Sequence, residues 1–281
     1  MQADVLRVPV GPGAMHVERF GHGGTAVILI HGFGTSSFLW RNVAPAITEA
    51  GHTAYAIDLF GHGESDRPLD ADFGISAQAE YLDAAMTALR VARGIVVGVD
   101  IGGDIALRLA ATRPERVEKL VLINTPTFDE LPARDITQMQ RSTAKFAFRT
   151  TRGVLGAAPL IEGVLKGSVA DSEAHMPVKL IARYLAPFAG RDGVNHLLSL
   201  ASSITAEDVE DIDLRTIHVP ALVIWGEEDQ WTDAKTADSL VNSLPDGRLV
   251  RLPGIGRLVP EESPERMNAL LLEFMKRRAV A

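Results

Sequence analysis

The chain has 281 residues, 46% hydrophobic and 23% charged, which is typical of a globular protein and excludes disordered, collagen-like and coiled-coil classes. Its 28 Lys and Arg against 36 Asp and Glu give a formal charge of -8, so its average surface would repel nucleic acids and anionic membranes. The absence of Cys excludes disulfides, thiolate catalysis and sulfur-bound metals. No signal-peptide pattern is present, and no apolar run approaches the ~18 residues of a membrane span. We therefore expect a cytoplasmic enzyme without a nucleic-acid or membrane partner.

Short β-rich runs alternate along the chain with amphipathic stretches. The strands are predicted at 25–30, 53–57, 94–98, 117–123, 221–225 and 248–252, and the helices at 36–50, 76–92, 101–112, 234–243 and 263–278. The run at 26–30 is apolar at every position, which indicates a strand buried on both faces, as in a parallel sheet covered by helices. The sequence therefore predicts an α/β fold.

The strand pattern is interrupted once, between the fourth and fifth predicted strands. Residues 126–215 have helical character throughout, and we predict that they form an inserted lid on a core built from 1–125 and 216–281. The acidic run at 207–213 is interpreted as a solvated linker and not as a metal site. Neither a metal nor a cofactor is predicted.

A tight turn with an acidic residue joins the strand at 94–98 to the helix at 101–112. The segment Gly98-Val99-Asp100-Ile101-Gly102 has the nucleophile-elbow pattern, with Asp100 where Ser is commoner. Gly98 and Gly102 suit a strained backbone and a close approach of helix to strand. The helix N-terminus would favour the ionised carboxylate. The plainer alternative is that Asp100 is only an N-cap.

Further motifs follow other predicted strands, at 31–34, 58–65, 225–229 and 252–257. Together with the elbow they resemble the α/β-hydrolase superfamily over nearly the whole chain, with a mostly parallel sheet flanked by helices. The Asp at the elbow resembles the haloalkane dehalogenase and epoxide hydrolase branch. This resemblance implies a nucleophile at Asp100, a catalytic acid at Asp229, and an oxyanion hole made by the backbone amides of Phe33 and Ile101.

The sequence departs from this family pattern at the general base. Where the motif has Gly-His, the chain has Gly256-Arg257. Arg257 cannot take a proton from water near neutrality because its pKa is above about 12. In the Asp-nucleophile mechanism the ester intermediate is hydrolysed by an activated water, so this step is expected to stall.

The leaving-group sites of the two resembled enzymes are also altered. Ile101 and Phe33 stand where the dehalogenases bind halide through ring or amide N–H groups. Epoxide hydrolases of this branch use two lid tyrosines, and Tyr184 is the one tyrosine of the predicted lid. His196 and His175 are the histidines of the lid that would have to supply a base, although each is more often a structural or surface histidine.

Two interpretations of Arg257 remain open. In one, it pairs with Asp229 and closes a retired site. In the other, it binds a substrate carboxylate or enolate while Asp100 moves a proton.

Three functions follow, in order of preference, for a site carried by Asp100, Asp229 and Arg257. The first is a non-hydrolytic lyase, isomerase or cyclase acting on a small, mostly apolar substrate under a lid that excludes water. The second is a dehalogenase-like or epoxide-hydrolase-like enzyme with a base from the lid. The third is a non-catalytic ligand-binding protein, because the fold alone does not determine function. A homodimer is left open.

Overall fold

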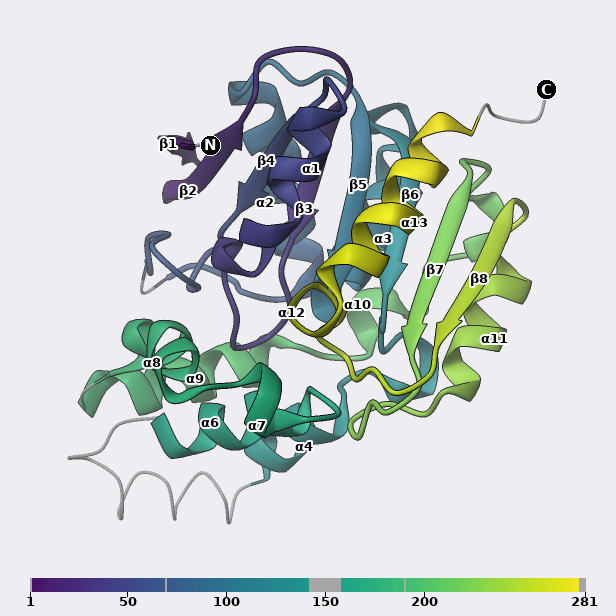
Figure 1. The fold of residues 1–281 in the computed structure, drawn as a ribbon. Helices are drawn as coiled ribbons and strands as arrows, with labels where there is room; N and C mark the ends of the chain where they lie inside the picture. The colour runs from purple at the N-terminus through teal and green to yellow at the C-terminus, as the bar shows by residue number, and fades with distance from the viewer. Residues whose placement is uncertain (1, 69, 142–157, 190, 278–281) are drawn as a thin grey trace.

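An eight-stranded sheet runs through the centre of the computed structural model, which describes residues 2–68, 70–141, 158–189 and 191–277 (Figure 1). The strands are β1 (Asp4–Val10), β2 (Gly13–Phe20), β3 (Ala26–Ile30), β4 (Thr53–Ile57), β5 (Gly94–Val99), β6 (Val117–Ile123), β7 (Ala221–Gly226) and β8 (Gly247–Leu252). Their order in the sheet is β1-β2-β4-β3-β5-β6-β7-β8. Neighbouring strands from β4 to β8 are parallel, whereas β1 and β2 pair antiparallel.

The six predicted strands are confirmed to within one residue at each end, but β1 and β2 were missed. These two strands form an antiparallel hairpin at the edge of the sheet, and much of β1 is exposed. An edge strand lacks the continuous apolar run that marks a buried parallel strand. In contrast, every residue of β4, β5 and β7 is buried.

Helices flank the sheet on both faces. They are α1 (Ala44–Glu49), α2 (Ile75–Ala88), α3 (Ile101–Thr112), α11 (Lys235–Ser243), α12 (Val259–Glu262) and α13 (Pro264–Lys276), with short 3-10 turns at Ser37–Asn42, Pro114–Arg116, Phe128–Glu130, Ala186–Phe188 and Leu214–Thr216. Figure 1 shows α1 and α13 on the side of the sheet that faces the viewer. Helices α2 and α3 pack against each other, and α3 packs on β5 and β6.

The structure corrects two of the predicted helices. The helix predicted at 36–50 is two pieces, because a new helix starts at Ala44 with Pro45 in its first turn, and proline has no N–H to continue the preceding one. The helix predicted to end at 92 ends at Ala88, and Arg90 follows with a left-handed φ of 59°. Helix α3 has the predicted bounds.

A group of helices separates β6 from β7 and lies beyond the C-terminal ends of the parallel strands (Figure 1). Its members are α4 (Arg134–Gln140), α6 (Ala158–Gly167), α7 (Ser172–His175), α8 (Val178–Leu185), α9 (Arg191–Ser203) and α10 (Glu207–Glu210), and we call them the lid. The described residues between 124 and 220 contain no strand. Part of the predicted lid, 142–157, lies outside the described residues. In the described part of the chain, no helix has the length and apolar character needed to cross a membrane.

Candidate functional site

Asp100 lies at the turn between β5 and α3, as the elbow pattern predicts. Its backbone is strained, with a φ of 54°, and the residue is only 1% exposed. The turn is possible because both glycines leave room for backbone: a Cβ on Gly98 would lie 2.1 Å from the carbonyl oxygen of Gly102, and one on Gly102 would lie 2.5 Å from that of His31. The local sequence therefore holds the carboxylate at the edge of the sheet under the lid.

Replacement of Gly98 by Ala is expected to destabilise the protein by at least about 2 kcal/mol, because its Cβ meets main chain that cannot move aside. The matched control is Gly163→Ala in α6, where a Cβ has no atom within 4 Å and the helix should gain up to about 1 kcal/mol. Urea unfolding of both variants measures the difference. Equal stabilities would show that the elbow is not tightly packed.

The carboxylate of Asp100 is held on two sides. Its Oδ2 accepts a hydrogen bond from the backbone N–H of Phe33, at 2.9 Å. Its Oδ1 lies 3.1 Å from Nη1 of Arg257. Ile101, the other residue predicted for an oxyanion hole, is the first residue of α3. The structure therefore brings both predicted residues beside Asp100, with the Phe33 amide directed at the carboxylate itself.

Arg257 links Asp100 to Asp229. Its Nη1 faces Asp100, and its Nε hydrogen-bonds Oδ2 of Asp229 at 3.3 Å. In a catalytic triad one histidine makes these two contacts, with one ring nitrogen toward the nucleophile and the other toward the acid. Arg257 makes both contacts and is only 2% exposed, so it occupies the position of the missing base.

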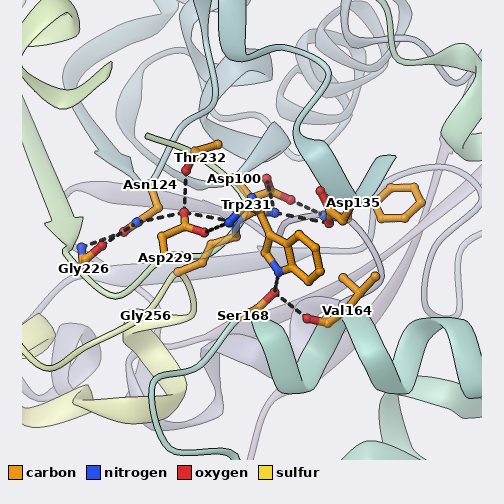
Figure 2. A network of polar contacts seen from close by, with 12 residues as sticks. Asp100, Asn124, Asp135, Val164, Ser168, Gly226, Asp229, Trp231, Thr232 and Gly256 are labelled. Carbon is orange, nitrogen blue, oxygen red and sulfur yellow. Dashed lines mark hydrogen bonds and ion pairs between the residues drawn. The ribbon is translucent and has the colours of Figure 1, made fainter. Parts of the chain in front are cut away.

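Asp229 is the best satisfied carboxylate of the site (Figure 2). It accepts hydrogen bonds from the Asn124 side-chain amide at 3.1 Å, the Trp231 backbone N–H at 2.9 Å and the Thr232 hydroxyl at 2.5 Å, besides Arg257. Asn124 is itself fixed by Gly226, whose N–H donates to Oδ1 of Asn124 at 2.8 Å. These donors orient Asp229 and stabilise its negative charge.

A third carboxylate, which the sequence did not predict, completes the cluster. Oδ2 of Asp135, in the first turn of α4, lies 3.4 Å from the same Nη1 of Arg257. An acidic residue in a first helical turn is explained by the helix dipole alone, so the sequence contained no signal for this role. The site therefore joins the lid to the core through one buried guanidinium.

The electrostatics of the cluster are set by burial and by an excess of negative charge. Burial raises the pKa of Asp100 to about 6; Arg257 opposes this shift, while the carboxylates of Asp135 and Asp229 add to it. Burial also raises the pKa of Asp135, again against Arg257. A single guanidinium does not neutralise three neighbouring carboxylates, so the protonated form of Asp100 is favoured up to a higher pH than for an ordinary aspartate.

The lid residues predicted as further contributors lie elsewhere. Nε2 of His196 is engaged with the carbonyl of Gly61 at 2.6 Å, and its ring stacks on Phe188. The hydroxyl of Tyr184 donates to Glu261. His175, at the end of α7, lies close enough to Glu262 to affect its pKa. In the described part of the chain, none of the three candidates is bonded to Asp100.

Two histidines of the core lie nearer the elbow, but their ring nitrogens are engaged or buried. His31 accepts from the Leu59 N–H through Nε2 at 3.1 Å, which leaves Nδ1 to donate to the carbonyl of Gly32. His62 packs edge-on to Phe33, and burial holds its pKa well below 6.5. Neither replaces the absent triad histidine in this arrangement.

A pocket of about 250 Å³ adjoins the cluster on the lid side. Its wall includes Asp135, which contacts Arg257, and Trp231, whose backbone N–H binds Asp229. The rest of its wall is mostly apolar and comes from α4 and α6, including Met139, Leu160 and Val164. The space beside Asp135, the one carboxylate of the cluster in this wall, therefore suits a small apolar group.

The fold and the elbow define the class of protein to which the chain belongs. Residues 25–264 match the family described as "alpha/beta hydrolase fold", so the chain is a member of that family. The predicted fold class is thereby confirmed, and the chain is an enzyme of the α/β-hydrolase superfamily.

Several known proteins that are similar to the chain are named as hydrolases. A 2-hydroxy-6-oxononadienedioate/2-hydroxy-6-oxononatrienedioate hydrolase from Burkholderia vietnamiensis is 29% identical over 278 residues, which cover 94% of this chain and 91% of the relative. The N-acyl homoserine lactone degrading enzyme Est816 is 25% identical, with a TM-score of 0.78 over 96% of this chain and 100% of that one. The haloalkane dehalogenase DbeA from Bradyrhizobium elkani is 22% identical, with a TM-score of 0.83 over 98% of each chain, and shares the fold.

Proposed function

We propose that the protein is a non-hydrolytic enzyme of the α/β-hydrolase fold in which Asp100 is the acid–base group, as in a lyase, isomerase or cyclase. One observation carries the proposal: the position of the hydrolytic base is filled by Arg257, while burial raises the pKa of Asp100 to about 6. A carboxyl group that titrates near neutrality both takes and returns protons efficiently. The closed surroundings of Asp100 favour proton transfer over attack by water.

The roles of the other site residues follow from their contacts. The Phe33 amide orients Asp100 through Oδ2. Asp229 holds Arg257 in place. Nη2 of Arg257 is buried and has no hydrogen-bond partner among the described residues. A donor left free in this way suits an oxygen atom on which negative charge develops during the reaction.

The substrate that fits this charge distribution is small, uncharged and mostly apolar. Three carboxylates surround one guanidinium, so the cluster is net negative when all are ionised and would repel an anion. This balance argues against binding of a substrate carboxylate by Arg257. The same charge balance disfavours a dioate such as the one in the name of the Burkholderia relative.

Hydrolysis by an Asp nucleophile is the second candidate, supported by the hydrolase names of the relatives and by the position of Asp100. It requires a base that the lid histidines do not supply in this arrangement. A ligand-binding protein without turnover is the third candidate, and it has no observation of its own in its favour.

Intact-protein mass spectrometry separates the first two candidates. During incubation with a reactive epoxide or haloalkane, wild type should stay unmodified or accumulate a stable ester on Asp100, because Arg257 cannot activate water. Arg257→His restores the triad contacts toward Asp100 and Asp229, so any ester should be released roughly a hundredfold faster. Sustained hydrolysis by wild type, with oxygen from labelled water in the product, would contradict the proposal.

Proton transfer itself is tested by deuterium uptake. Carbonyl compounds of graded size, incubated with wild type in D₂O, should exchange the hydrogens next to the carbonyl, and Asp100→Asn should abolish this exchange. NMR of the recovered compounds measures it. Equal exchange by wild type and Asp100→Asn would exclude Asp100 as the acid–base group.

A further inference from the structure

Asp100 and Asp135 approach the same nitrogen atom from opposite parts of the fold. Oδ1 of Asp100 lies 3.1 Å from Nη1 of Arg257, and Oδ2 of Asp135 lies 3.4 Å from it. Asp100 belongs to the elbow of the core, whereas Asp135 belongs to α4 of the lid. The two carboxyl groups therefore lie on either side of one guanidinium nitrogen, which forms an ion pair with each.

Both carboxyl groups are incompletely satisfied. Oδ1 of Asp100 and Oδ1 of Asp135 make no hydrogen bond with a described residue, although both side chains are at most 2% exposed. Asp229 differs, because four donors converge on its carboxylate. A buried carboxylate without enough donors is costly when charged, and a proton removes that cost. Burial therefore favours the protonated forms of Asp100 and Asp135.

The charged and titratable groups facing Asp100 come from several elements. Arg257 and Asp229 follow β8 and β7, and Asp104 lies one helical turn further along α3. Asp104 is fully buried, and burial together with Asp100 raises its pKa well above its usual range. Asp135 is the member of this set that belongs to the lid.

We propose that Asp135 is a positioning residue whose carboxylate, beside the same Nη1 of Arg257, favours the protonated form of Asp100, so that docking of α4 sets the pH at which Asp100 changes from an acid to a base. With Asp135 in place, the two carboxyl groups titrate as a coupled pair, so Asp100 takes up its proton at a higher pH than it would without this neighbour. Without it, Asp100 shares the guanidinium with Asp229 alone and ionises at lower pH. This inference rests on the proposed function only in that Asp100 is taken to use its proton in catalysis.

The test is a titration of Asp100 in the full-length protein, which needs no substrate. Protein labelled with ¹³C at the Asp side-chain carboxyl is followed by NMR between pH 4 and 9, and the Asp100 signal is assigned by its loss in Asp100→Asn. In Asp135→Asn the midpoint of the Asp100 titration should fall by about one pH unit. Asp135→Ser removes the same charge and serves if the Asn variant does not fold.

The matched control is Asp208→Asn, another lid residue that binds the core. Its carboxylate accepts hydrogen bonds from the N–H groups of Ile75 and Ser76 at the start of α2 and does not contact Arg257. This variant should weaken the attachment of the lid and leave the Asp100 midpoint within a few tenths of a pH unit of wild type.

An Asp100 midpoint that is unchanged or raised in both Asp135 variants would overturn the inference. So would an equal downward shift in Asp208→Asn, because the cause would then be general loosening of the lid. The outcome is independent of the exchange experiment. If Asp100→Asn loses deuterium exchange but the Asp135 variants do not shift the Asp100 titration, Asp100 stays the acid–base group and Asp135 does not control its pKa. A titration shift without any exchange supports the pair and contradicts the proposed reaction.

Discussion

Replacement of Arg257 by Met is expected to destabilise the protein by about 3 to 5 kcal/mol at pH 8, the range measured when one partner of a buried ion pair is removed. Arg257 is the only cation in contact with Asp100, Asp135 and Asp229 among the described residues. Without it, the pKa values of Asp100 and Asp135 in the folded state rise further above the unfolded values. Stability is then lost as the pH rises through the folded pKa values, so the loss should shrink toward pH 5.

Urea unfolding at pH 5 and pH 8 measures this difference. The control is Arg108→Met, which breaks an ion pair with the exposed Asp211 and should cost less than about 1 kcal/mol at either pH. A cost for Arg257→Met that is small, or equal at both pH values, would show that Arg257 does not compensate the buried carboxylates.

Replacement of Asp100 by Asn should instead stabilise the protein above pH 7, by up to about 3 kcal/mol. The pKa of Asp100 is raised from 3.8 to about 6, so its contribution to stability is fully present below 3.8 and is lost as the pH rises through about 6. Asn is neutral at every pH and has the same shape. The two proteins should therefore be similarly stable near pH 4 and diverge as the pH rises, while the proposed activity is abolished.

The free energy of unfolding of both proteins between pH 4 and pH 8 tests this expectation. Asp229→Asn is the matched comparison, because an amide N–H₂ would face the donors that now bind the Asp229 carboxylate, and this variant should be destabilised. If Asp100→Asn is less stable than wild type at pH 8, then Arg257 and the Phe33 amide stabilise the charged carboxylate more than burial opposes it.

Stability and activity would thus move in opposite directions at Asp100. Groups arranged for catalysis are often unfavourable for folding, since a carboxyl group with a raised pKa is costly when ionised. Arg257 limits this cost without removing it, because one positive charge faces three carboxylates. The ratio of one guanidinium to three carboxylates therefore determines the effect of both substitutions on stability.

Local sequence determined the fold class and the elbow. The apolar runs of strands such as β3 and β7 follow from burial on both faces of a parallel sheet. Such runs can be recognised in the sequence without tertiary information. Gly98, Asp100 and Gly102 form the elbow because its backbone needs small residues at fixed spacing. The absence of a histidine at Arg257 was likewise readable from the motif alone.

The tertiary structure decided which charges meet. Asp135 is distant in sequence from both Asp100 and Arg257, and its contact depends on how α4 packs on the core. The same packing directs His196 to Gly61 and Tyr184 to Glu261, away from Asp100. Periodicity and motifs reflect short-range constraints. The burial and the pKa of a site residue, and the net charge of the cluster around it, depend on groups brought together by long-range contacts. The sequence by itself therefore identified Asp100, Asp229 and Arg257 as candidates, and only the folded arrangement showed that a third carboxylate shares the guanidinium.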